Sequence, residues 1–348
     1  MSTVVLTGGT GFLGGVILAQ LMEETDHEVT ALVRAQDDAG AQARLADVCL
    51  RLWGDSTPPR PIRALAADVE RPRLGMSETA YAELAESCEK LIHSAAAIGF
   101  TQPLAEARAI NVEGTARVLD LAHTAREAGA EARLVHVSTA YVAGRRSGVI
   151  LESELDEGQD FRNTYEQTKV EAEKLVGDSG LGAAIVRPSI IVGESRSGWT
   201  SAFNVIYGPI RAFAGGRLKS IPVSGEGLVD LVPVDLVAEA CVTACDLPDE
   251  GAFHVASGEL VVNGETLARM VAEELGVRAV EFQAEGAPDL GDYAPYLNVA
   301  CRFSTARSAE RLGISVPPLE DYLPALLAYA TEARWGKRPQ ARRAVACT

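Results

Sequence analysis

Two short stretches hold side chains that could protonate and hold a carbonyl oxygen. Ser138 and Thr139 follow an apolar run, and Tyr165 and Lys169 stand four residues apart in a segment with helical spacing, so they share one helix face. Hydride transfer to a carbonyl leaves negative charge on oxygen, which needs a proton donor and a hydrogen-bond donor within reach. We predict that Tyr165 supplies the proton and that Thr139 donates to the substrate oxygen, with Ser138 as a neighbour or substitute. We also predict that the Lys169 ammonium lowers the pKa of the phenol, which is about 10 in a free tyrosine.

A glycine-rich turn near the N-terminus is typical of a dinucleotide site. The apolar run Val4–Leu6 leads directly into this turn, and a helical pattern follows it. Gly8 and Gly11 allow a tight turn and close approach to a pyrophosphate, and Gly14 allows the helix to pack on the strand. The phosphates would lie at the helix N-terminus, where free N–H groups favour an anion. The predicted cofactor contacts in this segment are Thr7, Gly8, Thr10, Gly11, Phe12, Leu13 and Gly14.

The end of the second apolar run indicates which dinucleotide is preferred. NAD-specific proteins usually place an Asp or Glu there to bind the ribose 2′-hydroxyl, but this chain has Arg34. A guanidinium suits the 2′-phosphate of NADP, and Arg44 in the next helical segment is a second candidate contact. Arg44 fits equally well as an exposed helix residue, and the nearby Asp37 and Asp38 oppose an anion. The expected cofactor is therefore NADP(H).

Three further strand ends would complete the cofactor site. Asp68 and the amide of Val69 follow the third strand and could contact the adenine edge. Ser94, Ala95 and Ala96 follow the fourth strand, where small residues would let the cofactor lie against the backbone. A turn aspartate and small residues at a strand end are also common without a ligand. The remaining predicted cofactor contacts of this kind are Lys169, through the nicotinamide ribose hydroxyls, and Pro188.

These residues require a parallel sheet that brings several strand ends together. Short apolar runs alternate with segments of helical spacing, which predicts an α/β fold with a Rossmann-type doubly wound parallel sheet. The expected strands are Val4–Leu6, Val29–Val33, Arg63–Ala66, Lys90–His93, Leu134–Val137, Ala184–Val186, Ala252–Val255 and Val277–Gln283. The expected helices are Leu13–Glu24, Ala41–Trp53, Ser77–Glu86, Leu104–Glu127, Phe161–Val176, a short one at Phe203–Phe213, Pro233–Asp246, Gly264–Leu275 and Leu319–Ala333.

The rhythm of strands and helices also predicts how the chain divides. We expect residues 1–190, with 230–256 returning to them, to form an NADP-binding domain, and residues 191–229 and 257–335 to form a smaller C-terminal substrate lobe. Residues 336–348 read as a basic tail that is frayed and solvated, with a docking strip for an acidic or phosphorylated partner as the alternative. The basic residues from Ala333 onward are Arg334, Lys337, Arg338, Arg342 and Arg343.

Composition limits the classes of partner. The formal net charge of −16 over 348 residues argues against general nucleic-acid binding. The six cysteines are scattered without histidines at zinc-site spacing, so we expect reduced thiols, no metal and a cytoplasmic location. The first residues lack the pattern of a signal peptide, and no apolar run reaches the ~20 residues of a membrane span.

The motifs together resemble those of the extended short-chain dehydrogenase/reductases over nearly the whole chain. The matching residues are the Thr7–Gly14 glycine turn, the Ser138–Thr139 pair, and Tyr165 with Lys169. This resemblance implies a Rossmann domain with a C-terminal substrate lobe and makes Thr139, Tyr165 and Lys169 the catalytic set. Asn111 matches a recurring asparagine of the family and is added to the predicted site on that basis, as support only.

Four more stretches resemble one branch of that family. They are Leu32–Ala35, His93–Ala96, His136–Val142 and Val232–Val237. The branch is the male-sterility-type NAD-binding group, which includes fatty acyl-CoA reductases and the terminal thioester reductases of peptide and polyketide assembly lines in secondary metabolism. There NADPH reduces an acyl thioester to an aldehyde and sometimes on to an alcohol. The chain shows no carrier or adenylation domain, so we expect a substrate presented in trans by an acyl carrier protein or CoA, or a free aldehyde or ketone.

Other functions remain open from the sequence. One is an NADP-dependent ketone or alcohol dehydrogenase resembling the 3β-hydroxysteroid or dihydroflavonol enzymes. A sugar-nucleotide epimerase or dehydratase fits less well because such enzymes usually keep NAD and an acidic residue in place of Arg34. A non-catalytic cofactor-sensing regulator would be expected to lose Tyr165 or Lys169. Homodimerisation is possible in any of these cases.

The stretch from Trp199 to Lys219 is the expected substrate loop, because long loops in compact domains are usually functional. Phe203, Tyr207 and Phe213 are expected to form an apolar wall, although helix-like spacing also fits simple packing onto the lobe. The positive charges of this region are Arg196, Arg211, Arg217 and Lys219. An apolar acyl group with an anionic handle suits both features.

Overall fold

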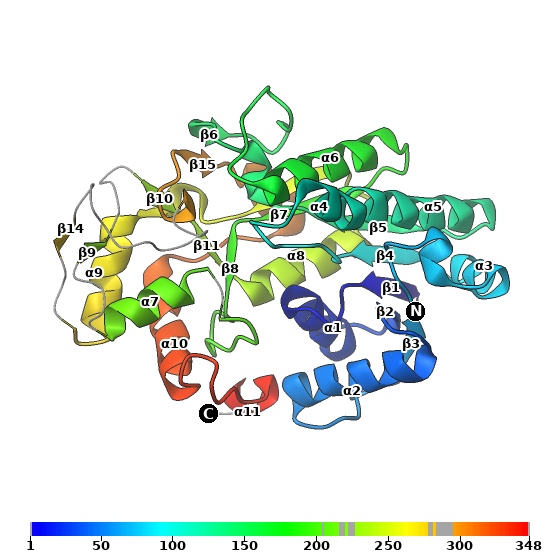
Figure 1. Ribbon diagram of the computed structural model, residues 1–348, viewed down its shortest axis with the longest axis horizontal. Coiled ribbons are helices and arrows are strands. Elements are labelled where there is room, and N and C mark those ends of the chain that lie inside the picture. Colours follow the sequence, from blue (N-terminus) through cyan, green and yellow to red (C-terminus); the bar gives the residue numbers. More distant parts are fainter. Residues whose placement is uncertain are drawn as a thin grey trace.

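A seven-stranded parallel sheet forms the centre of the described chain (Figure 1). The computed structural model describes residues 2–203, 205–215, 220–221, 227–277, 281–282 and 295–346. The strand order is β12-β7-β5-β4-β1-β2-β3, and all six neighbouring pairs run parallel. The strands are β1 (Thr3–Thr7), β2 (Glu28–Val33), β3 (Ile62–Ala66), β4 (Lys90–His93), β5 (Arg133–Val137), β7 (Ala184–Pro188) and β12 (Gly251–Val255). The predicted fold class is confirmed.

The order of the strands reverses between β1 and β4. The chain runs outward from β1 through β2 to β3, then crosses to β4 and continues through β5 and β7 to β12. In open α/β sheets, ligands bind at such a reversal, outside the carboxyl ends of the strands. The glycine turn after β1 and the small residues after β4 therefore lie side by side at the point where a dinucleotide is expected.

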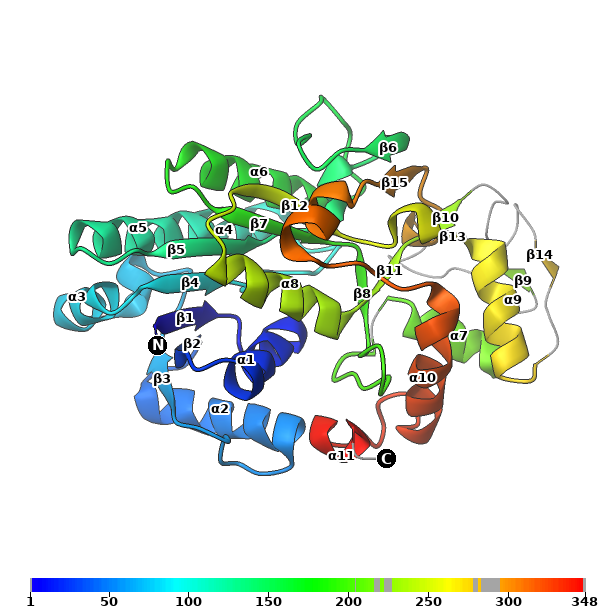
Figure 2. The same ribbon diagram turned by 180° about the vertical axis from the view of Figure 1, so that it is seen from behind.

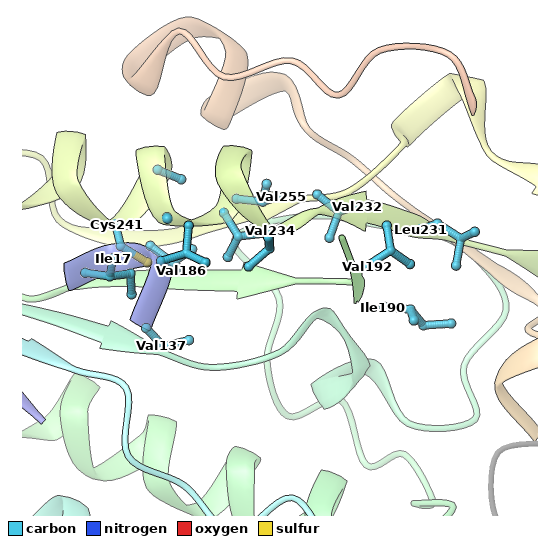
Figure 3. Close-up of a cluster of buried hydrophobic side chains, with 14 of the residues drawn as sticks. Ile17, Val137, Val186, Ile190, Val192, Leu231, Val232, Val234, Cys241 and Val255 are labelled. Atoms are coloured by element: carbon cyan, nitrogen blue, oxygen red, sulfur yellow. The ribbon is translucent and has the colours of Figure 1, made fainter. Parts of the chain in front are cut away.

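Helices cover both faces of the sheet, as Figures 1 and 2 show. One face is covered by α3 (Glu78–Glu86), α4 (Leu104–Asn111), α5 (Glu113–Glu127) and α6 (Thr164–Asp178). The other face is covered by α1 (Phe12–Glu24), α2 (Asp38–Trp53) and α8 (Val234–Asp246). Ile17 of α1 and Cys241 of α8 are buried against Val137 and Val186 of the sheet, and Figure 3 shows this apolar layer. Two layers of helices thus bury both faces, as a parallel sheet requires.

The remaining strands and helices lie outside the seven-stranded sheet. The strands there are β6 (Gly148–Ile150), β8 (Ile190–Val192), β9 (Ser220–Ile221), β10 (Leu228–Val229), β11 (Leu231–Pro233), β13 (Val262–Asn263), β14 (Glu281–Phe282) and β15 (Cys301–Phe303). The helices are α7 (Tyr207–Ala214), α9 (Gly264–Glu274), α10 (Leu319–Glu332) and α11 (Arg342–Ala346). β8 pairs with β11 and β6 pairs with β15, so residues far apart in the chain meet beside the sheet.

The predicted helix Leu104–Glu127 is wrong in one respect, because it is two helices. α4 ends at Asn111 and α5 begins at Glu113. The Thr115 hydroxyl donates to the Asn111 carbonyl (2.6 Å), and the Asn111 side chain is buried among other partners. Side-chain hydrogen bonds of this kind compete with the regular backbone ladder and bend a helix. Of the predicted strand Val277–Gln283, the structure describes β14, and residues 278–280 and 283 lie outside the described residues.

Three findings concern metals, thiols and membranes. Among the described residues, no group of three or more His, Cys, Asp or Glu side chains is placed to hold a metal ion. Cys49, Cys88, Cys241, Cys245 and Cys301 are buried free thiols, and Cys347 lies outside the described residues. Within the described ranges, none of the helices combines the length and the apolar character that crossing a bilayer needs.

The C-terminal segment packs onto the body of the protein, so the prediction of a frayed, solvated tail is wrong. The Arg342 guanidinium donates to Glu23 at the end of α1 (2.8 Å) and to Glu194 after β8. Trp199 Nε1 donates to the Gln340 carbonyl (2.9 Å), and α11 lies against α2 (Figure 1). The sequence hid this because both carboxylates are far from Arg342 in the chain. Arg334, Lys337, Arg338 and Arg343 are exposed.

Replacing Arg342 should therefore destabilise the fold. Arg342→Ala leaves the Glu23 and Glu194 carboxylates without their shared donor, so we expect the free energy of unfolding to fall by about 1–3 kcal/mol. Arg343→Ala is the matched control, because this neighbour is exposed, and its effect should stay within about 0.5 kcal/mol. Denaturant unfolding measures both. Equal effects of the two substitutions would contradict the packed C-terminal segment.

Candidate active site

The glycine turn between β1 and α1 is closed so tightly that side chains are excluded. Gly8 has a φ of +76°, and a Cβ there would lie 2.6 Å from the Ala95 nitrogen. A Cβ on Gly14 would lie 2.1 Å from the Gly8 carbonyl oxygen, and Gly11 N donates to that same oxygen (2.9 Å). The first turn of α1 therefore packs directly on the end of β1. Its free N–H groups form a place for an anion.

A buried histidine joins the ends of β1 and β4. Thr115 Oγ1 uses its proton on the Asn111 carbonyl, so it accepts from His93 Nε2 (3.1 Å). His93 Nδ1 then accepts from Thr7 Oγ1 (2.7 Å), which also accepts from Ala95 N (3.2 Å). Burial lowers the pKa of His93 to about 3, so the ring is neutral. Thr7 thus holds the two strand ends together.

Asn111 joins the segment after β4 to α6. Its Oδ1 accepts from Ala97 N (2.7 Å), and its Nδ2 donates to the Ala97 carbonyl (3.0 Å) and to Thr168 Oγ1 (2.9 Å). Thr168 belongs to α6, so the asparagine fastens the segment after β4 to the helix that holds Tyr165 and Lys169. All of its hydrogen-bonding atoms have partners in the protein, and its contact with a cofactor stays a prediction.

Tyr165 and Thr139 face each other across the mouth of the sheet. Thr139 follows β5, and its hydroxyl accepts from Tyr141 N (3.2 Å) at the start of a short 3-10 turn. Tyr165 lies in the first turn of α6, whose N-cap is Asn163. Burial raises the pKa of Tyr165 to about 12, while a hydrogen bond with Thr139 opposes the rise. The phenol is therefore protonated at neutral pH, the form that can donate a proton.

Lys169 is buried one turn further along α6. Its Nζ donates to the Val137 carbonyl (2.7 Å) and lies 3.4 Å from His136 Nε2. Burial lowers the pKa of Lys169 to about 8, and the Glu173 carboxylate opposes this. Burial of the phenol dominates the pKa of Tyr165 and raises it, and a lowering of that pKa by Lys169 stays a prediction. One of the three ammonium protons has no partner in these contacts, so it can donate to a ligand.

A buried ion pair fixes the residues beneath Lys169. Arg187 Nε donates to Glu173 (2.8 Å), and both side chains are almost fully buried. The Ser138 hydroxyl donates to the other oxygen of Glu173 (2.7 Å). Ser138 therefore supports the site from below, whereas the Thr139 hydroxyl lies at the phenol. A role for Ser138 as a substitute for Thr139 stays a prediction.

A cavity of about 290 Å³ connects the glycine turn with Tyr165. It runs along the reversal of strand order, so the predicted cofactor and catalytic residues share one space. The predicted residues that line it are Gly8, Gly11, Phe12, Leu13, Gly14, Ser94, Ala96, Ser138, Thr139, Tyr165, Lys169 and Pro188. The predicted residues that do not line it are Thr7, Thr10, Arg34, Arg44, Asp68, Val69, Ala95 and Asn111.

Arg34 lies outside this cavity, on the surface at the end of β2. Its guanidinium is 69% exposed and lies 3.7 Å from the Glu70 carboxylate. Arg44 donates to the Arg34 carbonyl, so it supports the backbone there. The Asp37 and Asp38 side chains accept backbone N–H groups of Gly40 (2.8 Å) and Ala66 (2.7 Å), so both acids are used in capping and turn contacts.

Asp68 and Val69 form the turn that faces Arg34 from β3. The Asp68 carboxylate accepts from Glu70 N (3.0 Å), and the Asp68 backbone N donates to the Leu74 carbonyl (2.8 Å). Val69 contacts the position of Gly114 on α5, where a Cβ would lie 3.1 Å from its side chain. Both residues thus have structural partners, and their contact with an adenine stays a prediction.

The cavity has an apolar wall, but residues other than the predicted ones form it. Tyr207 and Phe213 are buried at 3% and 5% exposure, and Phe203 packs on Tyr207 with ring centroids 5.3 Å apart. None of these three rings lines the cavity; packing onto the lobe explains their helical spacing. The apolar lining comes from Ile98, Phe100, Tyr141, Ile190, Ile191, Ala202, Val205 and Tyr296. Arg196 is exposed and Arg211 is half-buried, whereas Arg217 and Lys219 lie outside the described residues.

Besides the aliphatic lining residues, sequence reasoning missed two histidines and three aromatic residues of the site. His93 and His136 stand at the ends of β4 and β5, where inward polar residues on apolar strands give a signal. Tyr141 directly follows the Ser138–Ala140 stretch, so it could have been found from its position. Phe100 and Tyr296 lie in irregular segments with no periodic pattern, and only tertiary structure reveals them.

Comparison with known proteins gives a consistent result. The family described as "Male sterility protein", an NAD-binding family, matches residues 6–241. The L-2-aminoadipate reductase large subunit of Eremothecium gossypii is 30% identical over 307 residues, which cover 82% of this chain and 22% of that protein. Fatty acyl-CoA reductase 1 of Homo sapiens is 32% identical over 279 residues, which cover 69% of this chain and 54% of that protein. The chain thus spans about a fifth of the first relative and about half of the second.

A solved structure shares the fold over nearly the full chain. The crystal structure of the terminal R domain from the myxalamid PKS-NRPS biosynthetic pathway superposes with a TM-score of 0.81 at 24% identity. The match covers 98% of this chain and 93% of that one. It shows that the sheet, its flanking helices and the added C-terminal elements form a known arrangement.

Removing the phenolic hydroxyl should stop the chemistry and spare binding. Tyr165→Phe keeps the ring contact with Phe100, at 5.8 Å between centroids, but deletes the proton donor. We expect turnover to fall by about two to four powers of ten. Dinucleotide affinity, measured by fluorescence titration, should change little, whereas Lys169→Ala should weaken both. Full turnover of Tyr165→Phe would remove this residue from the chemistry.

Proposed function

The chain belongs to the male sterility family of NAD-binding proteins, within the extended short-chain dehydrogenase/reductases, and on that premise we propose that it is an NADPH-dependent reductase of an acyl thioester or of the corresponding aldehyde. The single observation that supports this most directly is the shared cavity: the glycine turn and the Thr139, Tyr165 and Lys169 side chains open into one space of about 290 Å³. A hydride donor held at one end would face the proton donor at the other. We further infer that residues 1–190 and 230–256 bind the cofactor, and that residues 191–229 and 257–335 bind the substrate.

The residues present fit a dinucleotide. A pyrophosphate needs backbone N–H groups within reach. Gly8 and Gly14 let β1, α1 and the segment after β4 pack closely, since a Cβ at either position would meet backbone atoms, and both glycines line the cavity at the start of α1. The free ammonium proton of Lys169 suits a ribose hydroxyl. Ser94 and Ala96 present small side chains to the cavity between these two points. Bound NADPH would supply the hydride for the reduction.

The protein's own groups handle the oxygen and the proton. Tyr165 holds a proton at Oη near neutral pH because burial raises its pKa, and it delivers that proton as charge develops on the substrate oxygen. The Thr139 hydroxyl, which donates to the Pro188 carbonyl (3.4 Å), would turn to donate a hydrogen bond to the same oxygen. With a thioester, this gives a hemithioacetal. Its carbon–sulfur bond then breaks while its hydroxyl proton passes to the sulfur, which releases an aldehyde and a thiol, and a proton from solvent restores Tyr165. The Lys169 ammonium keeps positive charge next to the site, which favours the phenolate that Tyr165 becomes once its proton has been delivered.

A carrier-bound or CoA-bound acyl group is the proposed form of the substrate. The E. gossypii and human relatives are named as reductases of aminoadipate and of fatty acyl-CoA, and the matching fold is a terminal domain of an assembly line. The exposed cations Arg334, Lys337 and Arg338 lie next to the loop at the cavity, because a Cβ on Gly336 would lie 2.8 Å from the Phe203 ring. Ala202 and Val205 of that loop line the cavity. These cations would attract the phosphate of a phosphopantetheine arm or the surface of an acidic carrier.

Cofactor preference gives one test of the proposal. The Arg34 side chain is exposed at the end of β2, 3.7 Å from the Glu70 carboxylate, so it can turn to a 2′-phosphate and form a charge-assisted bond. Arg34→Ala should weaken NADPH binding roughly ten- to a hundredfold and leave NADH binding nearly unchanged. Arg44→Ala is a useful comparison, because Arg44 donates to the Arg34 backbone. Equal losses for both cofactors with Arg34→Ala would place the 2′-phosphate elsewhere.

Substrate form gives the second test. NADPH oxidation is followed with acyl-CoA thioesters, carrier-loaded acyl groups, long-chain aldehydes and cyclic ketones. The triple change Arg334→Ala, Lys337→Ala and Arg338→Ala should raise KM for CoA-bound and carrier-bound thioesters roughly tenfold, with little effect on a free aldehyde. High salt should remove the difference, because it screens exposed charges. Turnover of ketones alone, with thioesters and aldehydes inert, would favour an alcohol dehydrogenase instead.

A further inference from the structure

Tyr296 brings a C-terminal residue into the catalytic cavity. It lines the cavity together with Tyr165, Phe100 and Tyr141, and it is 2% exposed. It stands in the segment just before β15, far along the chain from α6. No sequence motif marks it, and the chemistry described above does not use it.

The hydroxyl of Tyr296 is tied to the first turn of the catalytic helix. It donates to Glu166 Oε1 (2.7 Å) and accepts from Asn163 Nδ2 (2.8 Å). Glu166 directly follows Tyr165, and Asn163 caps α6 through Glu166 N (3.0 Å). The Glu166 side chain is fully buried and also binds Arg162 (3.1 Å), so its charge is compensated. A buried carboxylate with several donors holds its partners firmly.

The ring of Tyr296 forms a continuous aromatic wall with its neighbours. It stacks on Phe100 with ring centroids 4.9 Å apart and meets Tyr141 edge-on at 4.7 Å. Phe100 in turn contacts the ring of Tyr165. Because the Tyr296 hydroxyl already donates one hydrogen bond and accepts another, the part of the residue available to a ligand is the apolar ring.

The charges nearest the wall are already paired with each other: the Arg162 guanidinium lies over the Tyr296 ring, 5.8 Å from its centroid, and binds Glu166. Among the described residues that line the cavity, Lys169 is the one Lys, Arg, Asp or Glu. Its ammonium binds the Val137 carbonyl at the end of β5. A neutral apolar group next to the reacting carbonyl therefore gains most from this surface, since aromatic rings bury large apolar area.

We propose that Tyr296 is a specificity-determining residue: its ring is the wall on which an apolar acyl group packs beside the carbonyl, and its hydroxyl holds in place the first turn of α6, which carries Tyr165. The proposal rests on the proposed function, because it takes the acyl group as the ligand of this subsite. It limits the width of the acyl group, so unbranched chains are accepted and groups branched or ringed next to the carbonyl are excluded.

Two variants separate the ring from its anchor. Tyr296→Leu keeps an apolar side chain but shortens the wall, so the ratio of kcat/KM for a 2-branched over an unbranched thioester should rise about tenfold. Tyr296→Phe keeps the ring and loses the bonds to Glu166 and Asn163; it should lower kcat for both substrates and leave their ratio within about twofold. Tyr322→Phe is the matched control, because it removes a buried tyrosine hydroxyl bonded to the Leu231 carbonyl (3.0 Å) outside the cavity.

The readouts distinguish this role from a merely structural one. Loss of packing alone would lower the unfolding temperature and all turnover numbers without moving the substrate ratio. An unchanged ratio in Tyr296→Leu, with NADPH affinity preserved, would overturn the proposal. If the wild type reduces ketones and no thioester or aldehyde, the proposed function fails; the same ratio measured on narrow and wide ketones then still decides the role of Tyr296.

Discussion

The structure depends on burying the Lys169 ammonium one helical turn from the Tyr165 phenol while its charge stays compensated and its position stays fixed. A buried ammonium is costly unless donors and counter-charges surround it. Here the Val137 carbonyl and the neutral His136 ring accept from it, and Glu173 lies on the same helix face. Glu173 is in turn held by Arg187 from β7 and by Ser138 from the end of β5. The helix α6 can therefore sit over the sheet in only one register, and that register puts Tyr165 opposite Thr139.

Close packing of the backbone explains how the site is built around the glycine turn. Gly8 and Gly14 let α1, β1 and the segment after β4 approach until only backbone lies between them. His93 and Thr7 then lock the two strand ends, and Asn111 fastens the next residues to α6. Buried hydrogen bonds thus connect the glycine turn and the segment after β4 with α6. A change at one strand end is transmitted to the other because the connecting side chains are buried and have defined partners.

How much of this could be predicted from the sequence follows from the range of each interaction. The sheet strands were predicted to within two residues because buried parallel strands are continuous apolar runs bounded by turns. α6 was placed too early, since its start is set by the Asn163 cap rather than by its apolar spacing. The glycine turn and the Tyr165 and Lys169 pair are local patterns, so their spacing revealed them. The wall of Phe100, Tyr141 and Tyr296 and the Arg342 contacts join segments far apart in the chain, and no local pattern records such partners.

Those long-range contacts share a consequence for how the site is assembled. Tyr296 ties the segment before β15 to the first turn of α6, and Arg342 ties the C-terminal segment to α1 and to the loop after β8. Phe12, at the start of α1, contacts Trp199 in that loop, with ring centroids 6.4 Å apart, and Trp199 in turn donates to Gln340. Helix α1, which follows the glycine turn, and helix α6, which carries Tyr165, are therefore both held by later parts of the chain. The hydrogen bonds among these contacts have preferred angles, so they set the orientation of the joined segments as well as their distance. The C-terminal residues thus help to position α1 and α6, even though nearly all of the predicted site residues lie in the first half of the chain.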